Sequence, residues 1–375
     1  MAHTITIQSL ASTGKGVGTI EVDGHKRPVF VPFTCPGDRV KVKITKEHKK
    51  YYEAEIVTVV KESHLRTPIR CKHFLTCGGC NLLHMDYEAQ VEYKKRFLEF
   101  MFKPYYEKEI KVITGEPDFY RDKIKIFSDQ GAVGFKKAKS DEVVDVEECY
   151  LINQDFIEQF DQFAKVPGEY VLTADNEGIA IWDKRDNITI KAIEEGLAPV
   201  CTYTLKGKEI SYTPSCFIQA NTQLNERLVE EVVSLIEKEN ARTVLELFSG
   251  IGNFSSQITA NITCVEGDAV SYFFAKHNAP HAKNIFKDVY AYLDEEAKGQ
   301  YDVVLIDPPR TGITKGYEEK LAQLTNNIIY VSCSPQDLKR NIKEFSKLGF
   351  RVDQLIFVDM FPHTHHVELI CVLKN

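Results

Sequence analysis

The sequence predicts an α/β protein built from three parts, and three observations support this fold class. Residues 1–62 contain short β-branched strands divided by glycines, the pattern of a small β-barrel. In residues 211–375, short apolar strands alternate with helices, which is typical of a doubly wound sheet. Residues 63–210 mix helix and strand patterns around a group of cysteines. The length of 375 residues agrees with two or three domains of about 150 residues each.

The composition is that of an ordinary globular protein. With 43% hydrophobic and 27% charged residues, the chain is unlike disordered, collagen-like or coiled-coil proteins. No apolar run approaches the ~20 residues that span a bilayer, and residues 1–10 lack the basic and apolar regions of a signal peptide. We therefore expect a cytoplasmic protein that binds no membrane.

The net charge of −7 is unevenly distributed. Residues 1–62 contain 10 basic and 7 acidic side chains, whereas residues 151–375 contain 22 basic and 32 acidic ones. A contact with a polyanion should therefore depend on the N-terminal part of the chain.

Residues 1–62 fit a five-stranded barrel of the OB type, a common platform for oligonucleotides. The turn Pro36-Gly37-Asp38 and several glycines separate its strands. Lysines and tyrosines on the later strands offer the charge and stacking that RNA binding uses. A plain solvated surface explains the same residues equally well. They are Lys41, Lys43, Lys46, Lys49, Lys50, Tyr51 and Tyr52.

The middle part contains three cysteines in one loop and a fourth candidate further along. The spacing is Cys71-x5-Cys77-Gly-Gly-Cys80, and Cys149 follows in an acidic segment. Four thiols suit a zinc ion or a [4Fe–4S] cluster, and two thiols across Gly-Gly also suit a redox disulfide. Spacing alone leaves these alternatives open. A helix is predicted over 87–102. The isolated cysteines are predicted to be small buried side chains: Cys35, Cys201, Cys216, Cys264 and Cys371.

The α/β part places polar residues just after the carboxyl ends of strands, where open parallel sheets bind ligands. Its first strand leads into the turn Gly250-Ile-Gly252, after which we expect a helix. Glu266 ends the next strand, where a carboxylate can accept hydrogen bonds from ribose hydroxyls. Asp288 can hold an adenine edge in the same way. These signals together predict a cofactor that contains adenosine.

The later strands of this part carry a candidate wall, nucleophile and base. Asp307-Pro-Pro-Arg310 ends one strand, and its prolines stiffen the backbone beside a planar substrate. Cys333 ends the next strand before a helix predicted over 335–348, and a helix N-terminus lowers a thiol pKa. Glu368 follows a loop with three histidines in four residues. We interpret this loop as one that presents Glu368 as a general base, because the histidines lack the spacing of a metal site. A helix over 225–239 and a final antiparallel strand pair complete the prediction.

Several motifs, taken in order, resemble those of the RNA 5-methyluridine methyltransferases, which use S-adenosylmethionine. The resemblance extends over the whole chain; the N-terminal barrel resembles a TRAM domain, and the cysteine group resembles an iron–sulfur site. The last motif is the most specific, and the glycine turn is the least. Ser334 stands where the family usually has Asn, and Phe248-Ser249 stand where it often has Cys or Tyr. The motifs are Phe217-Ile-Gln219-Ala-Asn221, LELFSGIGNF, VEGD, DPPR, SCSP and DMFPHTHHVE.

The resemblance implies a fold and a reaction. The fold is a TRAM-like RNA-binding barrel (1–62), a central α+β iron–sulfur domain (63–210) and a Rossmann-like methyltransferase domain (211–375). In the reaction, Cys333 attacks C6 of an unstacked uracil, C5 takes the methyl group, and Glu368 removes the C5 proton. A [4Fe–4S] cluster would be held by Cys71, Cys77, Cys80 and Cys149. The implied S-adenosylmethionine-binding residues are Gln219, Phe248, Asn253, Glu266, Asp288 and Asp307.

The presence of both barrel and cluster resembles the enzymes that modify ribosomal RNA. We therefore expect a monomeric enzyme that acts on 23S rRNA. Three alternatives stay open: a tRNA T-loop uridine substrate, N-methylation through Asp307-Pro-Pro-Arg310, and a non-catalytic RNA-binding protein with a structural zinc site.

Overall fold

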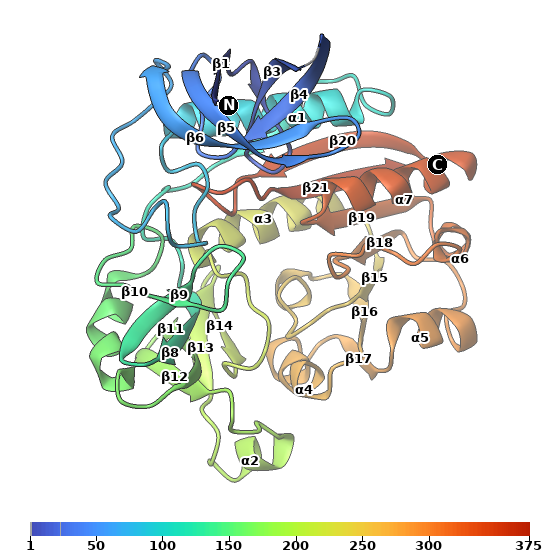
Figure 1. Cartoon of the computed structure of the whole chain (residues 1–375). Coiled ribbons are helices and arrows are strands. Elements are labelled where there is room, and N and C mark those ends of the chain that lie inside the picture. Colours follow the sequence, from blue (N-terminus) through green and yellow to red (C-terminus); the bar gives the residue numbers. More distant parts are fainter. Residues whose placement is uncertain (1, 23) are drawn as a thin grey trace.

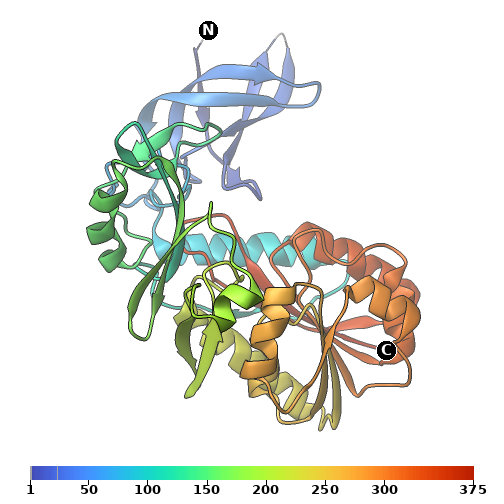
Figure 2. The ribbon, with the colours of Figure 1, turned by 90° about the horizontal axis from the view of Figure 1, so that it is seen from below.

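A computed structural model describes residues 2–22 and 24–375, and it contains the predicted barrel, middle part and α/β part (Figure 1). The barrel lies at one end of the molecule, with helix α1 (Tyr87–Phe102) between it and the large sheet (Figure 2). Among the described residues, no helix has the length and apolar character needed to cross a membrane. The mixed α/β fold class is confirmed.

The N-terminal sheet has the strand order β1-β5-β6-β4-β3-β2. Five strands are the expected ones, and β2 adds a two-residue pairing with β3. Buried and exposed residues alternate along β5, which gives the barrel its apolar core. The strands are β1 (Ala2–Thr6), β2 (Ser9–Leu10), β3 (Gly16–Val22), β4 (His25–Val31), β5 (Arg39–Glu47) and β6 (Tyr52–Lys61).

The middle part contains an antiparallel sheet of order β10-β9-β8-β11-β12, covered by a 3₁₀ segment, η1. Its apolar side chains form a core of their own. Helix α1 begins where the Asp86 side chain accepts a hydrogen bond from the Ala89 amide, an ordinary N-cap. The elements are β8 (Lys123–Asp129), β9 (Ala132–Lys136), β10 (Val143–Asp145), η1 (Gln154–Phe163), β11 (Gly168–Asp175), β12 (Gly178–Asp183) and α2 (Ile190–Glu194).

The large sheet has the order β17-β16-β15-β18-β19-β21-β20-β7. Strands β15 to β19 run parallel, as expected of a doubly wound sheet. The last two strands, β20 and β21, form the predicted antiparallel pair, and β21 is antiparallel to β19 as well. The strands are β7 (Lys111–Ile113), β15 (Thr243–Leu247), β16 (Asn261–Glu266), β17 (Lys283–Phe286), β18 (Val303–Ile306), β19 (Asn327–Ser332), β20 (Arg351–Val358) and β21 (Glu368–Lys374).

Helices cover both faces of this sheet. Side chains of α3 and α4 join one apolar core, and side chains of α1, α5, α6 and α7 join the other. Helix α1 and strand β7 thus come from the middle of the sequence and pack on the large sheet. The hairpin of β13 (Cys201–Leu205) and β14 (Lys208–Tyr212) joins the core of α3 and α4. The helices are α3 (Thr222–Lys238), α4 (Ala269–Asn278), α5 (Val289–Glu295), α6 (Tyr317–Leu324) and α7 (Pro335–Lys347).

One predicted element is wrong. The helix expected after Gly252 is replaced by a 3₁₀ turn, η2 (Ser255–Gln257), before strand β16 begins at Asn261. Only eight residues separate Gly252 from Asn261, and the chain uses them to cross from the end of β15 to the start of the parallel strand β16. The glycine turn is therefore followed by a compact connection in place of a covering helix.

Candidate active site

The ends of three neighbouring strands bring Asp307, Cys333 and Glu368 to one edge of the large sheet. Strands β18 and β19 are parallel, with Ile306 paired to Tyr330, so Asp307 and Cys333 both follow carboxyl ends. Strand β21 is antiparallel to β19, with Leu369 paired to Ser332. Because this register places Glu368 beside the end of β19, the predicted nucleophile and the predicted base meet although 34 residues lie between them.

The Cys333 thiol lies in surroundings that favour its protonated form. Burial, Glu368 and Asp307 raise its pKa to about 11, against the opposite influence of Arg310. The expectation of a lowered pKa is therefore wrong for the free protein. The α7 N-terminus is already capped by the Ser334 hydroxyl, which accepts a hydrogen bond from the Asp337 amide, and burial beside two carboxyl groups outweighs the helix. Attack by Cys333 requires that its proton be removed within the complex.

Glu368 and Asp307 form a carboxyl pair that resists full ionisation. Glu368 is only 3% exposed, and burial, together with the Asp307 charge, raises its pKa well above the usual value. Burial also raises the pKa of Asp307 to about 7. With a pKa of about 7, the Asp307 carboxyl can hold and release a proton near neutral pH, as general acid–base catalysis requires. Arg310 lies near enough to lower the pKa of both Cys333 and Glu368, a role that the sequence analysis left unassigned.

The glycine turn after β15 is hydrogen-bonded to Glu266, the last residue of β16. Gly250 and Gly252 have φ angles of 56° and 87°, which a side chain would strain. The Gly250 amide donates a 2.8 Å hydrogen bond to Glu266 Oε2, and the Asp268 amide donates a 2.7 Å bond to Oε1. Each carboxylate oxygen retains further acceptor capacity. A Cβ at Gly250 would meet no atom within 4 Å, so open space faces the turn, and an adenosine-containing cofactor fits this donor and acceptor set.

Asp288 has a structural contact that the sequence analysis did not anticipate. It caps helix α5, because its Oδ1 accepts hydrogen bonds from the amides of Tyr290 and Ala291, both at 3.0 Å. No bond occupies Oδ2 among the described residues, so this oxygen keeps its acceptor capacity toward a ligand. Cofactor binding by Asp288 stays a prediction.

The other predicted cofactor residues differ in their surroundings. Asn253 exchanges two amide hydrogen bonds with Asn225, at 2.8 and 3.0 Å, and thereby ties the glycine turn to helix α3. Phe248 has a left-handed φ of 61°, and its ring packs edge-on against Tyr290. Gln219 is 8% exposed and lies just before α3. The cofactor roles of these three residues stay predictions.

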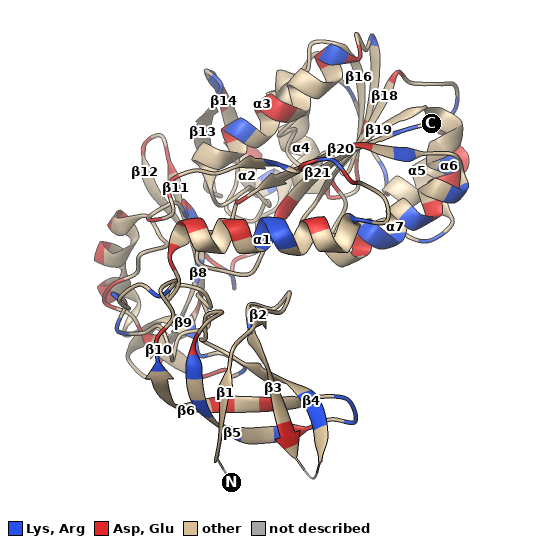
Figure 3. Ribbon diagram, turned by 90° about the horizontal axis from the view of Figure 1, so that it is seen from above, with Lys and Arg blue, Asp and Glu red and all other residues tan. Residues whose placement is uncertain are grey.

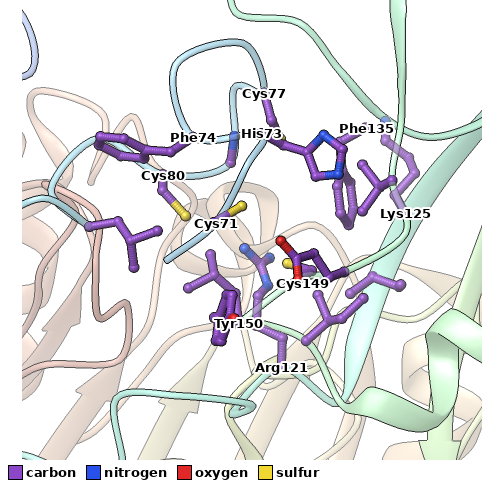
Figure 4. A pocket seen from close by; sticks show the side chains of 17 residues that line it. Cys71, His73, Phe74, Cys77, Cys80, Arg121, Lys125, Phe135, Cys149 and Tyr150 are labelled. Atoms are coloured by element: carbon purple, nitrogen blue, oxygen red, sulfur yellow. Dashed lines mark hydrogen bonds between the residues drawn. The ribbon is translucent and has the colours of Figure 1, made fainter. Parts of the chain in front are cut away.

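Four predicted metal ligands line one cavity of about 250 Å³ in the middle part (Figure 4). This cysteine pocket is lined by Cys71, Cys77, Cys80 and Cys149, with Arg121 among the remaining residues. In Figure 4 the sulfur atoms of Cys71, Cys80 and Cys149 turn toward the middle of the pocket. The Cys77 sulfur accepts a hydrogen bond from the Gly79 amide. The fold thus gathers thiols from two distant segments of the chain.

The thiols surround a space and do not meet at one point. Within residues 2–22 and 24–375, no group of three or more His, Cys, Asp or Glu side chains lies close enough to hold a single metal ion. A tetrahedral zinc site would bring the sulfurs to ~3.8 Å from each other, given Zn–S bonds of about 2.3 Å. Four thiols around one cavity are compatible with either a zinc ion or an iron–sulfur cluster as ligand sets.

The histidine loop acts as a shaped support. His363 contacts Asp118 through Nε2 at 3.1 Å, and His365 contacts Asn81 through Nδ1 at 2.7 Å. These partners agree with the interpretation that the loop presents Glu368. A second support is a buried ion pair at 2.6 Å between Lys94 of α1 and Asp359. No local pattern could identify this pair, because 264 residues separate its members.

The barrel surface is less basic in structure than in sequence. Acidic residues lie among the basic ones on its strands (Figure 3), and Lys43 pairs with Glu55 at 3.9 Å. Tyr52 is 3% exposed and belongs to the barrel core, so it cannot offer the stacking surface expected of it. Tyr51 stacks on His48, with ring centroids 4.2 Å apart. The exposed barrel lysines without an ion pair among the described residues are Lys41, Lys46, Lys49, Lys50 and Lys61.

Comparisons with known proteins agree with this architecture. The family model described as tRNA (Uracil-5-)-methyltransferase matches residues 197–285 and 292–375. The TRAM domain model matches residues 3–57. Both models therefore fall on the parts of the chain that form the large sheet and the barrel.

Curated relatives and one solved structure match nearly the whole chain. The 23S rRNA (uracil(1939)-C(5))-methyltransferase RlmD of Aliivibrio fischeri is 27% identical and covers 99% of this chain and 96% of its own. The protein of that name from Vibrio cholerae is 26% identical and covers 97% and 94%. The structure of Pyrococcus abyssi tRNA (uracil-54, C5)-methyltransferase with S-adenosyl-L-homocysteine has a TM-score of 0.76 at 22% identity and covers all of both chains. The whole fold, barrel included, is thus shared.

Proposed function

Since the chain belongs to the RNA uracil-5-methyltransferase family, we propose that it transfers a methyl group from S-adenosylmethionine to C5 of a uridine in RNA. The observation that carries the proposal is the convergence of Cys333, Glu368 and Asp307 at one sheet edge. A thiol beside two carboxyl groups of raised pKa is what covalent activation of a pyrimidine needs. An N-methyltransferase would need no thiol there.

The reaction proceeds through a covalent bond between protein and base. Cys333 loses its proton to the Asp307 carboxylate and its sulfur adds to C6 of the uracil, which makes C5 nucleophilic. S-adenosylmethionine supplies the methyl group that C5 takes. Glu368 then removes the C5 proton, the C5–C6 double bond re-forms, and the C6–sulfur bond breaks. The base must be unstacked, because C5 and C6 are approached from a face that stacking covers.

The cofactor would lie along the carboxyl ends of β15 to β18. Glu266 and Asp288 keep free acceptor capacity toward ribose and adenine, and the left-handed glycines let the backbone come close. Gln219, Phe248, Asn253 and Asp307 would line the remainder of the site. Asp307 would also adjoin the uracil.

A [4Fe–4S] cluster in the cysteine pocket forms part of the proposal. Cys71, Cys77, Cys80 and Cys149 would each supply a thiolate, and the cluster would bind two segments of the middle part together. All four cysteines line one cavity, and the resemblance of the cysteine spacing to that of the family favours a cluster over zinc. Its role would be to fold the central domain, proposed as residues 63–210, and to shape the RNA surface.

We favour 23S rRNA as the substrate, because the curated relatives bear that activity in their names over nearly the full length of the chain. A tRNA uridine is the second candidate, since the protein with the shared fold is a tRNA enzyme by name. An RNA-modifying enzyme of this kind would act as a monomer in the cytoplasm.

The proposal is tested with 5-fluorouridine RNA. A base cannot remove fluorine from C5 as it removes a proton, so the C6–sulfur bond cannot break. The active enzyme should therefore form a stable adduct between Cys333 and the RNA after methyl transfer. We expect a band of RNA-bound protein on a denaturing gel that requires S-adenosylmethionine. Mapping of 5-methyluridine in 23S rRNA and tRNA from a deletion strain would identify the substrate. If no adduct forms and the deletion strain keeps all of its 5-methyluridines, the protein is a non-catalytic RNA-binding protein and the proposal is wrong.

A further inference from the structure

The segment between β20 and β21, residues 359–367, is here called the catalytic loop because Glu368 follows it directly. It contains no helix or strand, so contacts with other parts of the chain must determine its shape. Those contacts come from the middle part: Lys94 binds Asp359, and the Tyr120 hydroxyl donates a 3.1 Å hydrogen bond to the Pro362 carbonyl. Most of the other hydrogen bonds between this loop and the middle part are made by one residue, His363.

The backbone of His363 is held by the cysteine loop. The amides of Asn81 and Leu82, which follow Cys80, both donate to the His363 carbonyl, at 3.1 and 3.0 Å. His363 itself has a left-handed φ of 62°. Such a conformation is strained in a residue with a side chain and persists only where the surroundings impose it.

The imidazole of His363 is equally constrained. The Gln90 amide nitrogen donates to Nδ1 at 3.1 Å, and Nε2 donates to Asp118 at 3.1 Å. The Gln90 amide oxygen also accepts the His363 backbone N–H at 2.9 Å. Gln90 is fully buried and His363 is 4% exposed. A neutral ring with one donor and one acceptor satisfies both partners, so its orientation is unique.

Asp118 extends this network to the other cysteine segments. Its carboxylate binds both terminal nitrogens of Arg70, the residue before Cys71. The Arg70 guanidinium also lies 4.7 Å from the ring centroid of Tyr150, the residue after Cys149. The segments that contribute the pocket cysteines thus all reach His363, by backbone or through Asp118.

We propose that Asp118, His363 and Gln90 form a positioning network that transmits the arrangement of the cysteine pocket to the general base Glu368. Asp118 is a positioning residue: it contacts neither reacting atom and acts through His363. The inference rests on the proposed function, in which Glu368 acts only in the last step. In that step the C5–H bond breaks, its proton goes to Glu368, its electrons form the C5–C6 double bond, and the sulfur leaves with the electrons of the C6–S bond.

A displaced Glu368 should therefore slow release and leave the earlier steps intact. The test uses Asp118→Asn and His363→Asn in the full-length protein. Asparagine tolerates a left-handed φ better than most residues, so His363→Asn removes the ring with little backbone strain. Glu368→Gln is the reference for blocked release. Glu147→Gln is the matched control, because it breaks the ion pair with Lys72 beside Cys71 and has no contact with His363.

Single-turnover reactions with unmodified RNA and methyl-labelled S-adenosylmethionine give the readout. We expect Asp118→Asn and His363→Asn to accumulate a methylated protein–RNA adduct, with release slowed tenfold or more and adduct formation within about threefold of wild type. Glu147→Gln should release at the wild-type rate. Hydrogen exchange at the Asn81 and Leu82 amides should also rise in both network variants, independently of activity.

Two results would overturn the inference. Release rates in both network variants within twofold of the control would show that the network does not position Glu368. An equal loss of adduct and product would show that the residues serve stability alone. If wild type forms neither adduct nor product, the proposed function itself fails, and that outcome is distinct from the other two.

Discussion

Cys333 and the four cysteines of the pocket share a residue type and differ in their neighbours. Burial raises the thiol pKa in both places. Cys333 lies beside Glu368 and beside Asp307, the group proposed to take its proton. The pocket cysteines lie near one another around an apolar cavity, with Arg121 close by. Burial alone therefore does not separate the two groups of cysteines. Their different neighbours are what distinguish the proposed nucleophile from the proposed ligands.

The largest expected effect comes from removal of the nucleophile. Cys333→Ala should lower methyl transfer by roughly 10⁴-fold or more, since the covalent step has no substitute. It should also abolish the adduct with 5-fluorouridine RNA while RNA affinity remains. The measurement is methyl transfer from labelled S-adenosylmethionine, with a filter-binding control. Full activity in this variant would refute the covalent mechanism and the contrast between the two cysteine groups.

A variant of the cysteine pocket should lose the proposed cluster and keep the reactivity of Cys333. Cys80→Ser removes one of the four proposed cluster ligands, so the brown colour and visible absorption that the proposed cluster would give the purified protein should be lost. Its Tm should fall by several degrees, because metal binding and folding are coupled. Alkylation of Cys333 should continue, which peptide mass spectrometry can measure. A colourless wild-type protein that contains zinc would instead favour the structural zinc site.

The pH dependence of Cys333 reactivity sharpens the comparison further. The thiolate is the reactive form, and the pKa of about 11 predicts that alkylation rises about tenfold per pH unit from pH 7 to 9. Asp307→Asn removes a negative neighbour that raises this pKa, so alkylation at pH 8 should become several-fold faster. Iodoacetamide labelling of the Cys333 peptide provides the measurement. A rate independent of pH over this range would show that the thiol is already ionised.

The smallest effect is expected at the barrel. Lys49→Gln with Lys50→Gln should weaken RNA binding a few-fold and reduce the salt slope by about 0.7 for each lost phosphate contact with single-stranded RNA. Lys43→Gln is the matched control, because Lys43 already pairs with Glu55 and should matter less. Binding titrations at several salt concentrations distinguish these cases. Equal effects of both changes would mean that the ion pairs do not weaken the lysines.

Much of the fold followed from local patterns. Helix α1 occupies its predicted residues, α7 differs from its predicted end by one residue, and the last strands form the predicted antiparallel pair. The five isolated cysteines are all buried, as predicted. The prediction of a helix after Gly252 was wrong, because the sequence pattern does not show how few residues connect β15 to β16. The prediction that Tyr52 offers a stacking surface was wrong, because the alternation of side chains along β6 places Tyr52 inside the barrel.

For the candidate site, too, some features could be predicted from local sequence patterns and others could not. Motifs and strand ends singled out Cys333, Glu368, Asp307 and the pocket cysteines as candidates, because residues at predicted strand ends and the spacing of Cys71, Cys77 and Cys80 are local signals. Their environments depended on the folded chain. The raised pKa of Cys333, the cap made by Asp288 and the support of His363 by Asp118 all arise between segments far apart in sequence. Burial and hydrogen bonding are properties of three-dimensional neighbours, and no linear pattern contains them.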